Sequence, residues 1–344
     1  METRPEIGDR AAMKAHIPYT LMLAAGLAWS QSQPPAVILD MRIENRVVYV
    51  ADTADVTKFA TDSKSTTPGA LRTFANFVSI ADIVSINGQP VKGTWTIRGM
   101  QLNMSPTAPP GQAIADTTRN NQVDAVFEIL QADGTPIGAI FAVGVSSGNP
   151  PPGAPLIANN TNFAIVGGTG AFLGARGQQS LVELIKTEHQ ASVTEDPSMR
   201  RVLGGGAGIR RLVLHLIPMT WPEIAGTPNG PAIVHSRDFA LVSPSNPAKA
   251  GETLSLFANG LGPTRPGVDP GTAFPSPPPA VVNSPVEVLV NGTAGTVLYA
   301  GGYPGTSNSY QVNFTLPPDI PPGSASIQLR VAWIAGPDVA IPIR

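Results

Sequence analysis

The segment from Val123 to Val145 reads VDAVFEILQADGTPIGAIFAVGV, two apolar runs joined by an Asp133-Gly134 pair. In the first run every second residue is apolar, so one face carries Val, Ala, Phe and Ile while the other mixes charged with apolar side chains. This period of two, with an Asp-Gly pair between the runs, predicts an antiparallel hairpin. The alternation does not say which face would line an interior.

Short runs rich in β-branched and aromatic residues continue on both sides of this segment. Turn residues such as Asn87-Gly88 separate them, which favours antiparallel strands over alternating strands and helices. We therefore predict an all-β fold, with an eight-stranded antiparallel barrel over residues 36–219. The predicted strands are Arg42–Val50, Arg72–Ile86, Gly93–Leu102, Val123–Leu130, Pro136–Val145, Phe163–Val166, Gln178–Lys186 and Arg210–Ile217.

A proline-containing stretch, TWPEIAGTPNGPA over residues 220–232, is interpreted as a linker. Beyond it, residues 233–344 contain several short strand candidates at turn-rich spacing, which is typical of an immunoglobulin-like β-sandwich. These candidates are Phe239–Val242, Thr253–Gly260, Val286–Val290, Gly295–Ala300, Tyr310–Leu316, Ala325–Ala335 and Val339–Ile343.

The N-terminal residues 1–30 are interpreted as a signal peptide. An apolar run from Leu21 to Trp29 follows Lys14, and Ala28 and Ser30 place small residues at the −3 and −1 positions of a cleavage site. The run is too short to span a membrane as a helix, and a buried N-terminal helix is the alternative. We expect an exported protein, secreted or periplasmic, whose translation starts at Met1 or Met13.

Composition excludes several classes of function. Among 344 residues the formal net charge is −2 and charged residues make up 13%, so no basic field exists to hold nucleic acid. The chain has no cysteine, which rules out disulfides, thiolate nucleophiles and Cys-ligated metals. Nothing beyond the signal peptide is apolar for long enough to predict a membrane span.

The segment NFAIVGGTGAFLGARGQ, residues 162–178, concentrates glycine. Leu173 stands where a dinucleotide-binding motif needs its third glycine, and no Gly-Lys-Ser/Thr follows for a P-loop. We interpret the segment as a tight turn between strands. Its structural glycines are Gly167, Gly168, Gly170, Gly174 and Gly177, and Arg176 beside them binds either an anionic ligand group or the carbonyls of the loop.

Other sequence patterns for catalysis are weak. His189, His215 and His235 have no metal-ligand spacing, so no metal or other cofactor is predicted, although His215 could face the barrel interior. Residues 144–148, GVSSG, match a nucleophile elbow by letter, with Ser146 at its centre. The NPPPG run that follows cannot begin the helix that this motif requires.

The glycine segment resembles the dirigent and allene oxide cyclase barrel families. Residues 82–95, DIVSINGQPVKGTW, and residues 127–144, FEILQADGTPIGAIFAVG, are similar to the strands that precede this segment in those families. The resemblance implies an eight-stranded antiparallel barrel with an internal, mainly apolar pocket, and a trimeric assembly. It provides no catalytic residue that can be assigned to this chain.

The second half resembles the C-terminal domain family of secreted Solibacter-type bacterial proteins. The similar phrases are LVSPSNPAKAG at residues 241–251, LSLFANGLGP at residues 254–263 and YQVNFTLP at residues 310–317. The resemblance implies a β-sandwich and an exported context, without a known activity.

Three hypotheses for the function follow. In the first, the chain is non-catalytic, with a barrel that binds a small apolar ligand and a sandwich that serves interaction or display. In the second, the barrel guides cyclisation or coupling of a hydrophobic substrate without a metal. In the third, side chains fill the barrel and it is a scaffold. Alternation and the glycine motif select Arg98, Glu128, Glu183 and Arg176 as candidate ligand-binding residues.

Overall fold

The computed structural model describes residues 36–52, 73–103, 121–146, 162–184, 189–191 and 208–344 of the chain. Every regular element in these ranges is a strand. The described residues therefore contain no helix that could span a membrane. The strands form a barrel sheet, a second large sheet and a two-stranded ribbon. The predicted all-β class is therefore confirmed, while the expected signal peptide lies outside the described residues.

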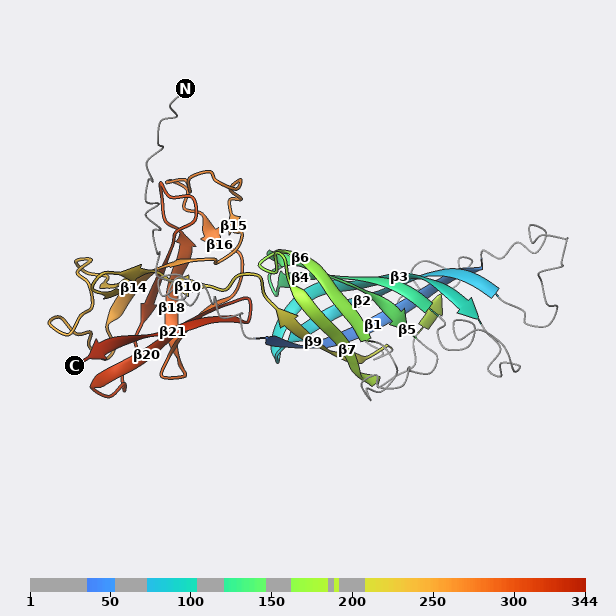
Figure 1. Ribbon diagram of the computed structural model, residues 1–344, viewed down its shortest axis with the longest axis horizontal. Helices are drawn as coiled ribbons and strands as arrows, with labels where there is room; N and C mark the ends of the chain where they lie inside the picture. The colour runs from blue at the N-terminus through green and yellow to red at the C-terminus, as the bar shows by residue number, and fades with distance from the viewer. Residues whose placement is uncertain (1–35, 53–72, 104–120, 147–161, 185–188, 192–207) are drawn as a thin grey trace, which may run out of the picture. The chain divides into compact units, whose positions relative to one another are not determined.

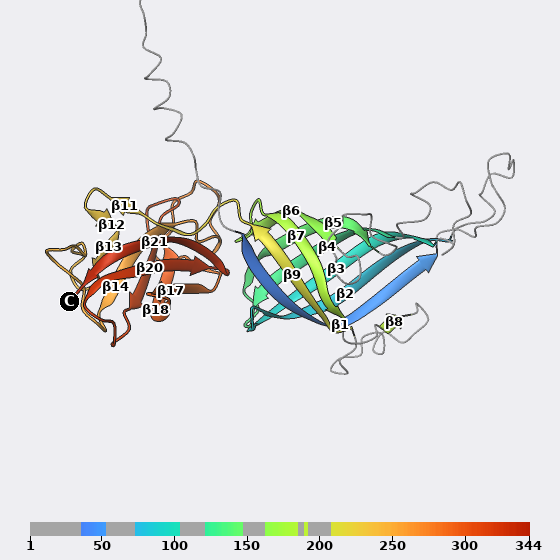
Figure 2. The same cartoon turned by 60° about the horizontal axis from the view of Figure 1, so that its bottom comes forward.

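A closed antiparallel barrel forms from the first part of the chain (Figure 1, Figure 2). The strand order is β2-β3-β4-β5-β6-β7-β9-β1, and β1 also pairs with β2, which closes the cylinder as predicted. A short strand β8 (His189–Ala191) lies parallel to β1. The barrel strands are β1 (Val37–Asp52), β2 (Thr73–Ile86), β3 (Gln89–Asn103), β4 (Asn121–Gln131), β5 (Pro136–Ser146), β6 (Asn162–Gly170), β7 (Arg176–Leu184) and β9 (Arg210–Ile217).

Tight turns join neighbouring strands where the sequence places Gly after Asn or Asp. Asn87 and Gly88, between β2 and β3, have φ angles of 50° and 78°, as a type I′ hairpin turn requires. Between β4 and β5, Asp133 Oδ1 accepts a hydrogen bond from the Thr135 N–H at 2.8 Å. That bond is the main reason why the pKa of Asp133 is lowered. The predicted turn chemistry therefore sets the register of both hairpins.

The apolar face of the strands points into the barrel. In β4, alternate residues from Val123 to Ile129 are at most 3% exposed, whereas Asp124 and Glu128 on the other face are exposed. Burying unpaired charges is costly, so the uniformly apolar face takes the interior. This settles the question that alternation alone leaves open.

The glycine segment forms the connection between β6 and β7. Gly170 has a φ of 62°, and a Cβ at this position would lie 2.5 Å from the Ile137 carbonyl oxygen. Gly168 lacks a positive φ, but a Cβ there would collide with the backbone oxygen of Phe172. The connection thus uses Gly170 for its conformation and Gly168 for the close approach of another strand's backbone. Of the five predicted glycines, positive φ occurs at Gly170, Gly174 and Gly177, and not at Gly167 or Gly168.

The second sheet follows the order β10-β14-β19-β18-β17-β20-β21, with β13 on β14 and the β15–β16 pair beside β18. The first part of β18 pairs with β17 and the rest with β19, so this strand joins the two halves of the sheet. Its strands are β10 (Glu223–Ile224), β13 (Ile233–His235), β14 (Thr253–Asn259), β15 (Thr264–Arg265), β16 (Val281–Val282), β17 (Val286–Val290), β18 (Thr293–Gly302), β19 (Tyr310–Thr315), β20 (Gly323–Val331) and β21 (Ile334–Ile343).

Hydrogen bonds of Ala248 bring the sheet close to closure. The Ala248 N–H donates to the Pro342 carbonyl at 3.0 Å, and the Arg344 N–H donates to the Ala248 carbonyl at 2.8 Å. The end of β21 therefore lies beside the chain that leads into β14. Figure 2 allows β14, β20 and β21 to be followed in one view.

Several predicted boundaries in this half differ from the structure. The segment expected as a linker contains β10 together with β11 (Gly226–Thr227) and β12 (Gly230–Pro231), and β10 pairs with β14. Residues 239–242 do not form the predicted strand, because Phe239 has a φ of 56° in a turn. The predicted strand Ala325–Ala335 breaks at Ala332 and Trp333, whose φ angles are 49° and 65°.

Candidate functional site

Apolar side chains pack densely inside the barrel. Trp95, Phe127 and Phe163 are each at most 1% exposed, and the rings of Trp95 and Phe127 stack with centroids 6.0 Å apart. In an eight-stranded barrel, inward side chains either fill the interior or leave room for one small ligand. Buried aliphatic residues from the adjoining strands β1 and β9 are Leu39, Met41, Leu212, Leu214 and Leu216.

Two uncharged polar side chains also face the interior. Gln179, on β7, is 0% exposed, and its partners in register on β6 and β9 are the buried Phe163 and Leu214. Ser79, on β2, is also 0% exposed and lies opposite the buried Ile97. Residues opposite one another on antiparallel strands point to the same face. Gln179 and Ser79 therefore belong to the inner lining.

Two arginines approach the Trp95 ring. Arg46 on β1 and Arg210 on β9 are 8% and 9% exposed, and their guanidinium carbons lie 5.6 Å and 5.9 Å from the ring centroid. At these distances the electron-rich face of the indole attracts a guanidinium cation. Burial lowers the pKa of Arg210 to about 10, so the group keeps its charge at neutral pH. The barrel thus contains two cations beside an aromatic ring.

Three lining residues have hydrogen-bonding atoms without a partner in the described part of the chain. These atoms are the two amide atoms of Gln179, Nε1 of Trp95 and Oγ of Ser79. A buried polar group left unpaired costs about 1–3 kcal/mol. The paths β3-β4-β5-β6-β7 and β3-β2-β1-β9-β7 are equally long, so Trp95 and Gln179 project from opposite walls. The unpaired Nε1 of Trp95 and the unpaired amide of Gln179 therefore lie on opposite sides of the barrel interior.

Two of the residues predicted from sequence lie on the outer wall. Arg98 is exposed and its Nε donates to Asp124 Oδ2 at 3.2 Å. Glu128 is exposed and its Oε2 accepts a hydrogen bond from Thr94 Oγ1 at 2.7 Å. Arg98 and Glu128, which were selected as candidate ligand-binding residues on alternating positions, therefore face solvent and not the barrel interior. On β3 and β4 both residues belong to the alternating set of side chains that points to solvent.

The other two predicted residues belong to β7. Arg176 is exposed, and its Nη1 donates to the carbonyls of Gly174 and Ala175 at 3.2 Å and 2.9 Å. These are the contacts that the loop-binding interpretation of Arg176 requires. Glu183 pairs in register with Arg211 of β9, and its side chain lies outside the described part.

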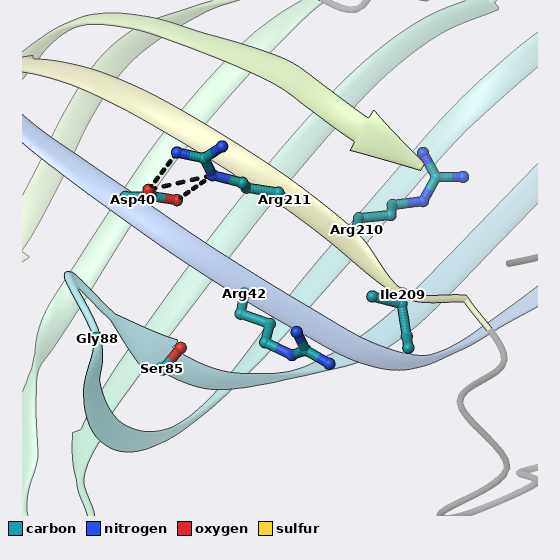
Figure 3. A pocket seen from close by; sticks show the side chains of 7 residues that line it. All are labelled: Asp40, Arg42, Ser85, Gly88, Ile209, Arg210 and Arg211. Carbon is teal, nitrogen blue, oxygen red and sulfur yellow. Dashed lines mark hydrogen bonds and ion pairs between the residues drawn. The ribbon is translucent and has the colours of Figure 1, made fainter. Parts of the chain in front are cut away.

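An outer pocket of about 210 Å³ lies between β1, β9 and the turn after β2 (Figure 3). Arg211 pairs with Asp40 at 2.7 Å on the outer side, whereas Arg210 extends away from that pair. Arg42 pairs with Glu44 at 2.7 Å. The outer arginines are thus matched by carboxylates, which weakens the pocket as an anion site. Its lining consists of Asp40, Arg42, Ser85, Gly88, Ile209, Arg210 and Arg211.

A second outer pocket, of about 440 Å³, lies on β2, β3 and β4. Its lining includes the predicted residue Arg98 and the exposed Met100, which is 54% exposed. The Arg98–Asp124 ion pair is 77% and 54% exposed at its two side chains, so solvent screens it. Its full lining is Phe77, Val78, Arg98, Gly99, Met100, Gln122, Val123 and Asp124.

The alternation of each strand is the sequence signal that marks the inner polar residues. In β9, Arg210 alternates with the buried Leu212, Leu214 and Leu216, and in β7 Gln179 alternates with the buried Leu181. Continuing each apolar alternation by two residues along its strand reaches Arg210 and Gln179. The same phase places His215 on the exposed outer face, which corrects the suggestion that it could face the interior.

Other predicted motifs stay apart from this interior. Within the described ranges, no three His, Cys, Asp or Glu side chains gather as they would around a metal ion. Ser146 ends β5, while the rest of the elbow-like GVSSG pattern lies partly outside the described residues.

Comparisons with known proteins provide no family for this chain. No protein-family model and no curated protein matches it. Among solved structures, the N-terminal domain of the Streptococcus gordonii adhesin Sgo0707 is similar with a TM-score of 0.17 and 11% identity, over 91% of this chain and 93% of that one. A similarity this weak carries no argument, so the function is argued from the geometry.

Proposed function

We propose that the protein is an exported, non-catalytic binding protein whose barrel holds one small, largely apolar ligand. The observation that carries this proposal is Gln179, which is 0% exposed and has, within the described ranges, no partner for either of its amide atoms. A bound molecule that pairs with the amide would remove a cost of about 1–3 kcal/mol per unpaired atom. An apolar lining with a few placed polar groups is the usual composition of a small-molecule site.

The interior chemistry supports binding over catalysis. The described inner polar groups are an amide, a hydroxyl, an indole N–H and two guanidinium groups, and none of these exchanges a proton readily near neutral pH. Glu128, a carboxylate selected from the sequence as a candidate ligand-binding residue, is exposed on the outer wall. The dirigent-like or cyclase-like alternative therefore has weaker support.

For the second sheet we propose an immunoglobulin-like sandwich that serves interaction or display. Alternating burial in β19 supports a packed layer, because Tyr310, Val312 and Phe314 are at most 7% exposed while the residues between them are partly exposed. The split pairing of β18 supports two strand groups, one towards β14 and one towards β21. Neither feature identifies a partner.

A filled scaffold is the second candidate function. It is favoured by the close packing of Trp95, Phe127 and Phe163. The two candidates differ in what they predict for Gln179. In a scaffold its unpaired amide is only a cost, whereas in a binding protein it is the contact that retains the ligand.

Native mass spectrometry of the full chain after gentle purification tests the proposal. We expect a retained small molecule, and we expect the protein to bind the neutral apolar dye Nile red. The variant Gln179→Met keeps the side-chain length and should retain less of the natural ligand. Gln178→Met, one residue away on the opposite face of β7, is the matched control. Absence of both a retained molecule and dye binding would favour the scaffold.

A further inference from the structure

The interior polar groups restrict the chemistry of the ligand. Resting on the proposed function, we infer that the barrel selects an uncharged molecule in which an N–H donor stands beside a carbonyl acceptor, as in a lactam or another cis-amide. Gln179 is the residue that would recognise this pair of atoms. Nothing in the barrel resemblance or in the apolar lining by itself specifies such a group.

The hydrogen-bonding pattern of Gln179 is the first step of the argument. Its Oε1 can only accept and its Nε2 can only donate, and both are unpaired in the described part of the chain. A lactam presents the reverse pattern, one donor and one acceptor side by side, and satisfies both atoms at once. A carboxylate, ether or ketone supplies acceptors alone and would leave Oε1 without a donor.

Charge is the second step. Arg46 and Arg210 lie within 6 Å of the Trp95 ring centroid, and Arg210, with a pKa of about 10, is charged at neutral pH. A cationic ammonium group supplies donors alone and would leave Gln179 Nε2 without an acceptor. An anionic group supplies acceptors alone and cannot satisfy Gln179 Oε1. A neutral donor–acceptor group meets both conditions.

The surroundings of Gln179 set the shape of the ligand. Phe163 and Leu214 flank it in register, and Trp95 projects from the opposite wall with an unpaired Nε1 donor. Apolar neighbours on two sides favour a flat, weakly polar ring. The indole donor favours a ligand with acceptor capacity to spare, which a lactam carbonyl has through its second lone pair.

Binding of matched probes to the full-length protein tests this inference. 2-Quinolinone is a flat lactam, N-methyl-2-quinolinone lacks its donor, and 2-naphthoate offers a carboxylate of similar size. We expect 2-quinolinone to bind about ten-fold more tightly than its N-methyl form, the difference that one hydrogen bond makes. The preference should disappear in Gln179→Met and persist in Gln178→Met, with fluorescence titration as the measurement.

The outcomes separate this inference from the proposed function. Equal affinity for 2-quinolinone and its N-methyl form, or tighter binding of 2-naphthoate, would overturn the lactam inference while Nile red binding kept the binding function intact. Loss of Nile red binding together with all three probes would overturn both. If Gln179→Met unfolds, Gln179→Leu provides the second variant, because it also removes both amide atoms, and the preference for 2-quinolinone should disappear in it as well.

Discussion

The barrel and the second sheet each bury a polar side chain almost completely, Gln179 in the barrel and His235 in the sheet, but these two residues have opposite surroundings. His235, on β13, is 1% exposed, and both its ring nitrogens face acceptors, Nδ1 at 2.6 Å from Glu252 Oε1 and Nε2 at 3.2 Å from the Asn246 carbonyl. The Lys249 N–H donates to the other oxygen of Glu252 at 2.9 Å. Gln179, equally buried, has no hydrogen-bond partner among the residues that the structure describes. The completed cluster around His235 stabilises the fold, whereas the unpaired amide of Gln179 is where we propose that a ligand binds.

The largest effect is expected from the completed cluster. His235→Leu leaves the Glu252 carboxylate without its imidazole partner, and breaking such a buried pair costs about 3 kcal/mol. Urea unfolding should show this loss. His215→Leu is the control, because His215 is exposed on the barrel wall and its replacement should change stability by less than about 0.5 kcal/mol. Similar losses of stability in both variants would contradict a stabilising role of the His235 hydrogen bonds.

A smaller effect of opposite sign is expected in the barrel. Gln179→Met removes two unpaired buried atoms from ligand-free protein and should raise the free energy of unfolding by about 1–2 kcal/mol. Gln178→Met should leave it nearly unchanged. A destabilised Gln179→Met protein would mean that the amide has a structural role. Gln179 would then stabilise the fold as His235 does.

The smallest effect is the dependence of stability on pH that Glu252 contributes. Burial raises the pKa of Glu252, but hydrogen bonds from His235 and from the Lys249 N–H outweigh it, and the net pKa lies below the usual 4.5. A lowered carboxyl pKa stabilises the fold above the unfolded value, and this stabilisation is lost as the pH falls through the folded value.

Unfolding measured between pH 7 and pH 3 checks this prediction. Wild-type protein should lose more stability over this interval than Glu252→Gln does. The gain from Gln179→Met should be constant, since an amide does not titrate. A wild-type protein whose stability loss equals that of Glu252→Gln would show that the carboxylate contributes nothing to the titration.

Much of the barrel is predictable from local sequence, because its strands alternate cleanly and its hairpins use Asn87-Gly88 and Asp133-Gly134. The turn between β20 and β21 is not, since Ala332 and Trp333 adopt positive φ without any glycine or asparagine. Both residues are buried and the Ala332 N–H donates to the Pro285 carbonyl at 3.0 Å, so contacts distant in sequence hold them in a conformation that local preference disfavours. The same limit explains why Ala325–Ala335 was expected as one strand.

The candidate site was predictable only in its location. Alternation indicates an apolar interior. Arg98 and Glu128 were selected because they are charged, but burying a charge is costly, so charged side chains of a strand tend to lie on its outer face. Gln179 and Arg210 are inconspicuous beside similar neighbours, Gln178 and Arg211, which point outward. Only the strand phase separates each pair.

Barrel closure also constrains how the chain acquires its shape. The N-terminal strand β1 pairs with β9, with Val37 opposite Leu216 and Ile43 opposite Arg210. The pairing of β1 with β9 therefore forms only after β9 has been synthesised. Contacts between residues so far apart in sequence form slowly. Until β9 arrives, β1 presents an open ladder edge that other chains could join. A protein built this way benefits from staying unfolded until synthesis has passed β9.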